Sequence, residues 1–169
     1  FEWNEIPLTK DIDPVDINFS IRGLALKKPF LVNIGNPHII FFDDEIEKYD
    51  VESFGSLIEN DNLFPEKINV SFAKLKSDNH IVLNVWERGA GKTNACGTAA
   101  CATAVAGVEM GLIKNKVTVT LPGGDLEIYY KSNDNIIMTG PTEINFTDKY
   151  KLWKIKILKK ILKYTSITH

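Results

Sequence analysis

Apolar runs separated by turn residues predict β-strands in the first half of the chain. Residues 29–34 and 38–43 are rich in Phe, Val and Ile, and Gly35-Asn36-Pro37 lies between them. This pattern predicts two strands joined by a tight turn. Two further strands are expected over residues 68–75 and 80–87.

Two segments have helical patterns of different kinds. After Asp50, apolar residues recur at helical spacing, which predicts a surface helix ending near residues 60–62. From Cys96 to Gly111 the residues are mostly small and apolar on every side, and no charge precedes Glu109. Because a helix without a polar face is buried all round, this helix is expected inside a curved sheet or barrel.

The last third of the chain predicts more strands, near residues 116–121, 124–130, 135–139 and 142–146, with Pro122-Gly123-Gly124 as a hairpin turn. Together the elements predict an α+β fold in which mixed strands form a barrel around the central buried helix. This organisation has no internal repeat or linker.

Three segments are expected: residues 1–28 with an interdomain segment and the first strands, the main domain over 29–148, and a basic amphipathic C-terminal extension over 149–169. The first residue is Phe1 rather than Met, and the opening residues have the composition of a loop. We therefore expect a fragment of a longer protein.

Charge is distributed unevenly along the 169 residues. The formal net charge is -2, but seven lysines and no acids fall between Lys149 and Lys163, so the rest of the chain is clearly acidic. An acidic body repels phosphates and argues against a nucleic-acid partner. Two cysteines five positions apart do not make a disulfide framework, and no signal peptide or membrane-spanning run is evident. These features predict a cytoplasmic location.

The lysine-rich extension has two interpretations. Its interspersed Leu, Ile and Trp residues suit a basic amphipathic helix that lies on an acidic membrane or a partner. The alternative, which we favour, is that it packs on the acidic body or is a non-native extension.

Cys96 is the strongest candidate for chemistry. It lies just before the buried helix, where unpaired backbone N–H groups and the helix dipole favour a thiolate. The N–H groups of Gly97 and Thr98 could bind a carboxylate at the same place. The alternative is that Cys96 is a small packing residue, because free cysteine is commonly buried, and Cys101 is expected to be core.

Three other side chains near predicted strand ends are candidates. Glu87 could accept an ammonium group, and Arg88 could bind a carboxylate with its planar guanidinium. His38 is expected to titrate near neutrality and to orient or polarise an acid–base group. Each also has a structural alternative: a surface ion pair for Glu87 and Arg88, and a turn histidine bonded to backbone for His38. No metal site is expected, since the three histidines and two cysteines have no ligand spacing.

Five motifs, in order and spacing, resemble the C-terminal domain of diaminopimelate epimerase. They are Ile34-Gly35-Asn36-Pro37-His38, Phe64-Pro65-Glu66-Lys67-Ile68-Asn69-Val70, Trp86-Glu87-Arg88-Gly89-Ala90-Gly91-Lys92-Thr93-Asn94-Ala95-Cys96-Gly97-Thr98, Leu121-Pro122-Gly123-Gly124 and Met138-Thr139-Gly140-Pro141. The N-terminal domain of the family is absent from these 169 residues, and the lysine-rich extension passes the family's usual end.

The resemblance implies a cofactor-independent epimerase with two similar domains, each contributing one cysteine. The two thiols act on opposite faces of the α-carbon and interconvert LL- and meso-diaminopimelate. Carried over by motif, Cys96 is one catalytic thiol, while Glu87 and His38 tune the thiols and hold the reacting end. The distal amino-acid group is recognised by Asn36, Asn69 and Arg88, and the reacting carboxylate by Gly97 and Thr98.

The resemblance also implies that the missing N-terminal domain is the partner of this chain, and that the chain alone is inactive. Self-association through an exposed domain face stays open. Two other functions also stay open: a related racemase or isomerase of the proline racemase or phenazine-biosynthesis kind, and a non-catalytic binding module on the same fold.

Overall fold

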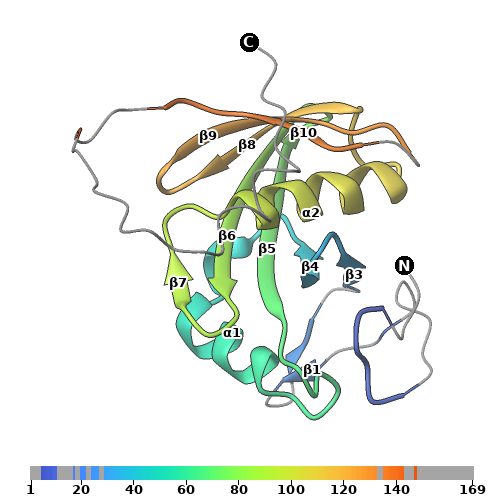
Figure 1. Cartoon of the computed structure of the whole chain (residues 1–169). Helices are drawn as coiled ribbons and strands as arrows, with labels where there is room; N and C mark the ends of the chain where they lie inside the picture. Colours follow the sequence, from blue (N-terminus) through green and yellow to red (C-terminus); the bar gives the residue numbers. More distant parts are fainter. Residues whose placement is uncertain are drawn as a thin grey trace, which may run out of the picture.

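The long helix α2 lies in the curve of a mixed β-sheet (Figure 1). The computed structural model describes residues 5–10, 17, 20–21, 24–26, 29–132, 135–142 and 147. The elements in chain order are β1 (Ser20–Ile21), β2 (Leu24–Ala25), β3 (Phe30–Asn33), β4 (Pro37–Phe42), the 3-10 helix η1 (Ile46–Lys48), α1 (Val51–Glu59), β5 (Asn69–Ser77), β6 (His80–Glu87), β7 (Gly91–Thr93), α2 (Gly97–Glu109), β8 (Lys116–Leu121), β9 (Gly124–Tyr129) and β10 (Ile137–Thr139).

The main sheet has the strand order β10-β9-β8-β6-β5-β4-β3, and β7 pairs with β6 off this path. Strands β4 and β5 are parallel and connected through α1, and strands β6 and β8 are parallel and connected through α2. Crossovers between parallel strands are right-handed as a rule. Both crossovers step in the same direction across the sheet, from β4 to β5 and from β6 to β8. Because β5 and β6 run antiparallel, the strands that start the two crossovers point in opposite directions. Two right-handed crossovers then place α1 and α2 on opposite faces of the sheet.

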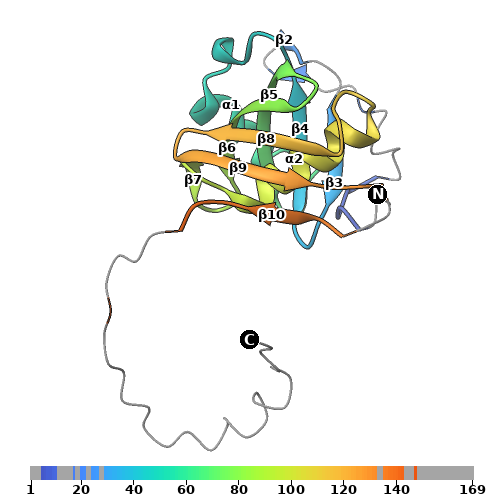
Figure 2. The ribbon, with the colours of Figure 1, turned by 90° about the horizontal axis from the view of Figure 1, so that it is seen from above.

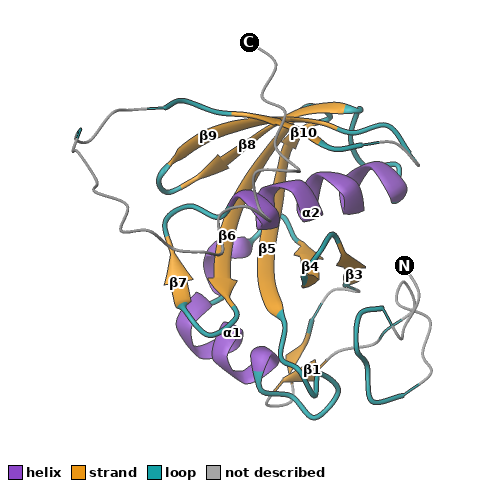
Figure 3. Cartoon of the chain, in the orientation of Figure 1, coloured by secondary structure: helices purple, strands orange, loops and turns teal. Residues whose placement is uncertain are grey.

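Burial agrees with this arrangement, since a separate apolar core lies on each face. Along β6 the buried positions alternate, with Ile81, Leu83 and Val85 in the core that contains α2. Strand β4 is buried on both faces, because Ile40 belongs to the α2 core and Ile39 to the core beneath α1. The central strands are therefore covered on both sides, as Figures 2 and 3 show.

Small side chains allow α2 to lie inside the sheet. All residues from Ala99 to Gly107 are buried. A Cβ added at Gly107 would lie 2.9 Å from the end of the Ile113 side chain, so the sheet and its connections approach the helix backbone closely. The prediction of a helix buried on every side is confirmed.

The α+β fold class is also confirmed, with a mixed sheet curled around α2 as a half-barrel. In the described part of the chain, β3 and β10 are the ends of the sheet and do not pair with each other. The expected strands over 29–34, 38–43, 68–75, 80–87, 116–121, 124–130 and 135–139 and the surface helix after Asp50 are all present, with boundaries within a few residues.

The sequence patterns missed β7 and η1, which are three residues each and too short for a periodic signal. Most of the strand expected over 142–146 and the whole extension 149–169 lie outside the described residues. No helix among the described residues is long and apolar enough to cross a membrane.

Candidate active site

Two segments distant in sequence meet at the first turn of α2. Asn36, in the turn before β4, donates from its side-chain nitrogen to Thr98 Oγ1 at 3.4 Å. Thr98 Oγ1 also lies 3.5 Å from Cys96 Sγ. His38 Nε2 lies 3.0 Å from Asn36 Oδ1. A chain of polar contacts therefore runs from the imidazole of His38 to the thiol of Cys96.

An open hollow of about 540 Å³ lies at this place. Its lining comprises Ile34, Glu87, Ala95, Cys96, Gly97, Thr98, Cys101, Ile136 and Met138. The Cys96 residue is only 6% exposed, yet it belongs to the wall of this hollow. The thiol is thus sheltered from bulk water but faces a space that a small molecule could enter.

Cys96 is the N-cap residue of α2, with an extended backbone at φ -145° and ψ 105°. Burial raises the pKa of its thiol, and the nearby Glu87 carboxylate raises it further. The Thr98 hydroxyl and the Ala99 N–H act in the opposite direction and lower the pKa. The net effect is an increase, so the expected thiolate is wrong for the chain as it stands, because desolvation outweighs the helix N-terminus.

His38 is completely buried, and burial together with the charge of Arg88 lowers its pKa from 6.5 to about 4. The expectation that it titrates near neutrality is therefore wrong, since a buried imidazolium lacks the hydration that favours it. Its Nδ1 has no hydrogen-bond partner among the described residues. At neutral pH, His38 is an uncharged group that holds Asn36.

Asn69 connects two of the segments that carry candidate residues. Its side-chain nitrogen donates to the Pro37 carbonyl at 2.8 Å, and its Oδ1 accepts from the Arg88 N–H at 3.0 Å. Asn69 is 4% exposed. The Arg88 side chain donates through Nη1 to the Glu66 carbonyl at 3.1 Å. Asn69 thus fixes the start of β4 relative to the end of β6.

Two groups at the hollow were not anticipated. Met138 of β10 covers the start of α2, since a Cβ at Gly97 would lie 3.1 Å from the Met138 sulfur. Cys101 is buried as expected of a core residue, but it also lines the hollow one turn along α2 from Cys96. A strand was predicted around Met138, but strand prediction does not reveal which residues a strand covers.

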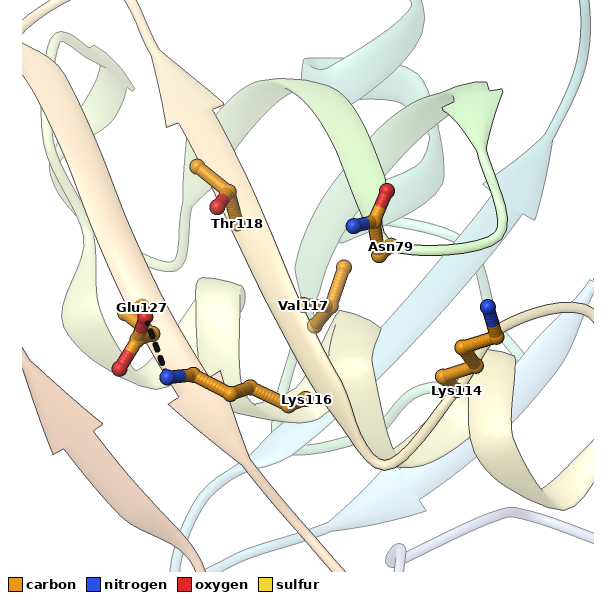
Figure 4. Close-up of a pocket in the computed structure, with 6 residues that line it drawn as sticks. All are labelled: Asn79, Lys114, Lys116, Val117, Thr118 and Glu127. Carbon is orange, nitrogen blue, oxygen red and sulfur yellow. Dashed lines mark ion pairs between the residues drawn. The ribbon is translucent and has the colours of Figure 1, made fainter.

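A second hollow, of about 310 Å³, lies on strands β8 and β9 away from this site (Figure 4). It contains Lys114 and Lys116, but Lys114 pairs with Asp78 at 2.7 Å and Lys116 with Glu127 at 3.0 Å. These lysines are already neutralised and exposed to water, so they do not form a built anion site. Among the residues that the structure describes, no three His, Cys, Asp or Glu side chains are grouped to hold a metal.

Comparison with known proteins gives a consistent family. A family model described as diaminopimelate epimerase matches residues 30–145. A protein of Erythrobacter litoralis named diaminopimelate epimerase is 47% identical over 146 residues, which are 86% of this chain and 54% of that protein. Its namesake from Bartonella quintana is 45% identical, over 86% of this chain and 52% of that protein. The chain therefore spans about half the length of the curated relatives it matches.

Solved structures give more distant similarities. A phenazine biosynthesis protein of the PhzF family from Enterococcus faecalis aligns with a TM-score of 0.45 and 19% identity, over 58% of this chain and 35% of that one. A PhzF-family protein from Bacillus anthracis aligns with a TM-score of 0.45 and 21% identity, over 63% and 34% of the two chains.

Proposed function

The chain belongs to the diaminopimelate epimerase family, and we propose that it supplies one half of an active site that interconverts LL- and meso-diaminopimelate without a cofactor. The observation that carries this proposal is the position of Cys96. Its thiol is at the N-terminus of a buried helix, beside Glu87 and in contact with Thr98, in the wall of an open hollow.

In this proposal Cys96 works in both directions of the reaction. Its raised pKa keeps it as a thiol in the resting chain, which is the form that can deliver a proton to the α-carbon. When the proton leaves Sγ, the Thr98 hydroxyl and the Ala99 N–H stabilise the thiolate, because both groups act to lower the pKa. In the reverse direction the thiolate takes the proton back.

The second proton transfer needs a base on the opposite face of the α-carbon. Cys101 does not suit this role, because it lies on the same helix and lines the same hollow as Cys96. We propose that the second thiol comes from the part of the relatives' length that this chain does not span. That cysteine, as a thiolate, removes the proton from one face and becomes a thiol, while the Cys96 thiol protonates the other face and becomes a thiolate, so the α-carbon is inverted and no net proton is consumed.

The remaining candidate residues bind substrate in this proposal. The N–H groups of Gly97 and Thr98 bind the reacting carboxylate at the start of α2. Asn36, Asn69 and Arg88 recognise the distal amino-acid group, and Glu87 accepts the ammonium of the reacting end. His38, which is uncharged, keeps the Asn36 amide turned toward Thr98.

Protection of Cys96 from alkylation by diaminopimelate tests the proposal on the chain itself. The assay is run near pH 9, because the raised pKa slows alkylation at neutral pH. We expect diaminopimelate to slow modification of Cys96 and lysine at the same concentration to have a much weaker effect. Equal rates with and without diaminopimelate would contradict the proposed site and favour a non-catalytic module.

Solvent-deuterium exchange tests the two-thiol chemistry. The chain alone is expected to incorporate negligible deuterium into LL-diaminopimelate, and robust exchange by the chain alone would refute the half-site. Mixed with the N-terminal half of the Erythrobacter litoralis relative, the chain is expected to become active. That activity should be lost in Cys96→Ala and kept in the matched variant Cys101→Ala.

A further inference from the structure

A buried carboxylate outside the hollow contacts the turn that follows Glu87 and carries Arg88. Glu59 is the last residue of α1 and is 4% exposed. Its Oε2 accepts from Trp86 Nε1 at 2.7 Å, and its Oε1 accepts from the Gly89 N–H at 2.9 Å. Lys67 Nζ lies 3.6 Å from Oε1. A buried charge is stable only with such partners. The Glu59 carboxylate is therefore a structural part of the region beside the candidate site.

Glu59 stays ionised in this environment. Burial alone would raise its pKa, but the hydrogen bonds from Trp86 and Gly89 and the charge of Lys67 lower the pKa below its usual range. An ionised carboxylate accepts more than one N–H at once. Here the Glu59 carboxylate holds the Trp86 side chain, near the end of β6, and the Gly89 backbone N–H just after it.

The turn between β6 and β7 is held by two acceptors in succession. Asn69 of β5 accepts from the Arg88 N–H, and Glu59 of α1 accepts from the next N–H, that of Gly89. Gly89 has a φ of +76°, so the chain reverses at this residue. The backbone on which Arg88 stands is thus fixed from two different elements.

The Arg88 side chain depends on Glu59 as well. Its guanidinium donates to the Glu66 carbonyl, and the next residue, Lys67, forms the ion pair with Glu59. Lys67 has a φ of +61°, which is unfavourable for a residue with a side chain. The ion pair therefore helps to hold the segment that presents the acceptor for Arg88.

Close packing keeps the end of α1 in reach of the turn. A Cβ at Gly55 would lie 2.5 Å from Cβ of Trp86, and a Cβ at Gly91 would lie 3.6 Å from the far edge of the same ring. Trp86 therefore lies between α1 and β7, which are neighbours beside β6 in Figure 1. This contact leaves Glu59 little freedom to move.

We propose that Glu59 is a positioning residue: it holds the β6–β7 turn so that Arg88 is presented to the anionic distal end of the substrate. It does so without contact to the reacting thiol. The identity of the ligand rests on the proposed function above, whereas the control of the turn does not.

The substitution Glu59→Gln tests this proposal with little change in shape. A glutamine has one acceptor oxygen and one NH₂ donor, so either Trp86 Nε1–H or the Gly89 N–H must then face a donor. We expect the amide hydrogens of Arg88 and Gly89 to exchange about tenfold faster, since a lost bond to a charged group of this kind costs at least about 1.4 kcal/mol. Nuclear magnetic resonance of the labelled chain measures both exchange rates.

Two site readouts separate positioning from general loss of stability. In Glu59→Gln, the dissociation constant for diaminopimelate, measured by resonance titration, is expected to rise about tenfold. The alkylation rate of Cys96 is expected to stay within about twofold, because Glu59 does not contact the thiol, and Glu87, which does act on it, is held in β6 by its pairing with Gly91. Asp43→Asn is the matched control, since Asp43 is also a 4% exposed carboxylate, bonded to Tyr49 and Lys48 far from the hollow. It should leave the dissociation constant unchanged.

A double variant supplies the rescue. Adding Trp86→Phe to Glu59→Gln removes the Nε1–H donor, so the glutamine oxygen can accept from Gly89 alone. We expect the Gly89 exchange rate to return to that of Trp86→Phe, and the affinity to recover with it, although the protein becomes less stable. If Glu59 had a purely structural role, the double variant should bind diaminopimelate more weakly than Glu59→Gln alone.

The outcomes divide the two hypotheses. If Arg88 and Gly89 exchange no faster in Glu59→Gln than in Asp43→Asn, the positioning role is refuted. If the unaltered chain shows no resonance shifts with diaminopimelate, the proposed function fails, while the exchange rates still decide whether Glu59 holds the turn.

Discussion

Gly55→Ala is expected to destabilise the protein, although helix propensity alone predicts the opposite. Gly55 is in the interior of α1, where alanine is favoured over glycine by about 1 kcal/mol. The added methyl group, however, would lie 2.5 Å from both Cβ and Cγ of Trp86 and 2.9 Å from Cδ2. Ordinary van der Waals contacts begin near 3.4 Å, so α1 and β6 must separate by almost 1 Å.

The size of the effect follows from what the methyl group meets. Cβ of Trp86 is attached to the backbone of β6 and does not move aside by a rotamer change, so the helix itself must shift. Overpacking costs about 1–3 kcal/mol, and because the atom met here is attached to the backbone, we expect about 2–3 kcal/mol, against a propensity gain of about 1 kcal/mol. We expect the free energy of unfolding to fall by about 1–2 kcal/mol. With a urea dependence of about 2 kcal/mol per molar, in the middle of the usual range, the midpoint should fall by roughly 0.5–1 M.

Urea unfolding followed by tryptophan fluorescence is the assay, and Gly107→Ala is the control. Gly107 is also a helix-interior glycine, in α2, but its added Cβ would meet Cδ1 and Cγ1 of Ile113 at 2.9 Å. These atoms are the flexible end of a side chain and can turn away. Gly107→Ala should therefore cost less than Gly55→Ala. A stabilised Gly55→Ala protein would refute the close contact between α1 and Trp86, and with it the restraint on Glu59.

Three further predictions concern the candidate site. Glu87→Gln should speed the alkylation of Cys96 by iodoacetamide at pH 8–9, because the carboxylate that raises the thiol's pKa is removed; an unchanged rate would argue against contact between these two groups. His38, with its pKa lowered to about 4, should contribute about 3 kcal/mol of stability above pH 6.5 that is lost as the pH falls toward 4. Urea midpoints at several pH values should show this loss in the unaltered chain and a smaller loss in His38→Gln. A resonance of the His38 imidazole that titrates near pH 6.5 would contradict the prediction. Thr98→Val should slow Cys96 alkylation, because loss of the hydroxyl raises the thiol's pKa further, and it should free the Asn36 amide. Thr98→Ser keeps the hydroxyl and should be alkylated as fast as the unaltered chain. Equal alkylation rates in all three proteins would show that the hydroxyl does not act on the thiol.

The local pattern of apolar and polar residues was sufficient to predict most of the secondary structure and the α+β class of the fold. Alternating apolar positions in β6 predicted a strand because side chains of a strand point to opposite faces. The absence of a polar face on α2 predicted burial on all sides. The motif around Cys96 also predicted which segments carry the candidate residues, and the structure brings Asn36, Thr98 and Cys96 together.

The protonation states could not be predicted in the same way. A thiol at a helix N-terminus is favoured as a thiolate by its own helix, but the pKa of Cys96 is raised by burial and by Glu87 from another strand. The position of His38 at the start of β4, next to a turn, gave no sign in the sequence that it is completely buried. Both pKa values depend on how much water and charge surround the group, and those surroundings come from elements far away in sequence.

The support of the site is also a product of long-range packing. Glu59 ends a surface helix, and its carboxylate has no local signal that distinguishes it from a solvated one, yet it binds Trp86 and Gly89, 27 and 30 residues later. Periodicity along a chain reports which face of an element is apolar. It does not report which two faces meet, because that choice minimises the exposed apolar surface and the unpaired polar groups of the whole domain at once.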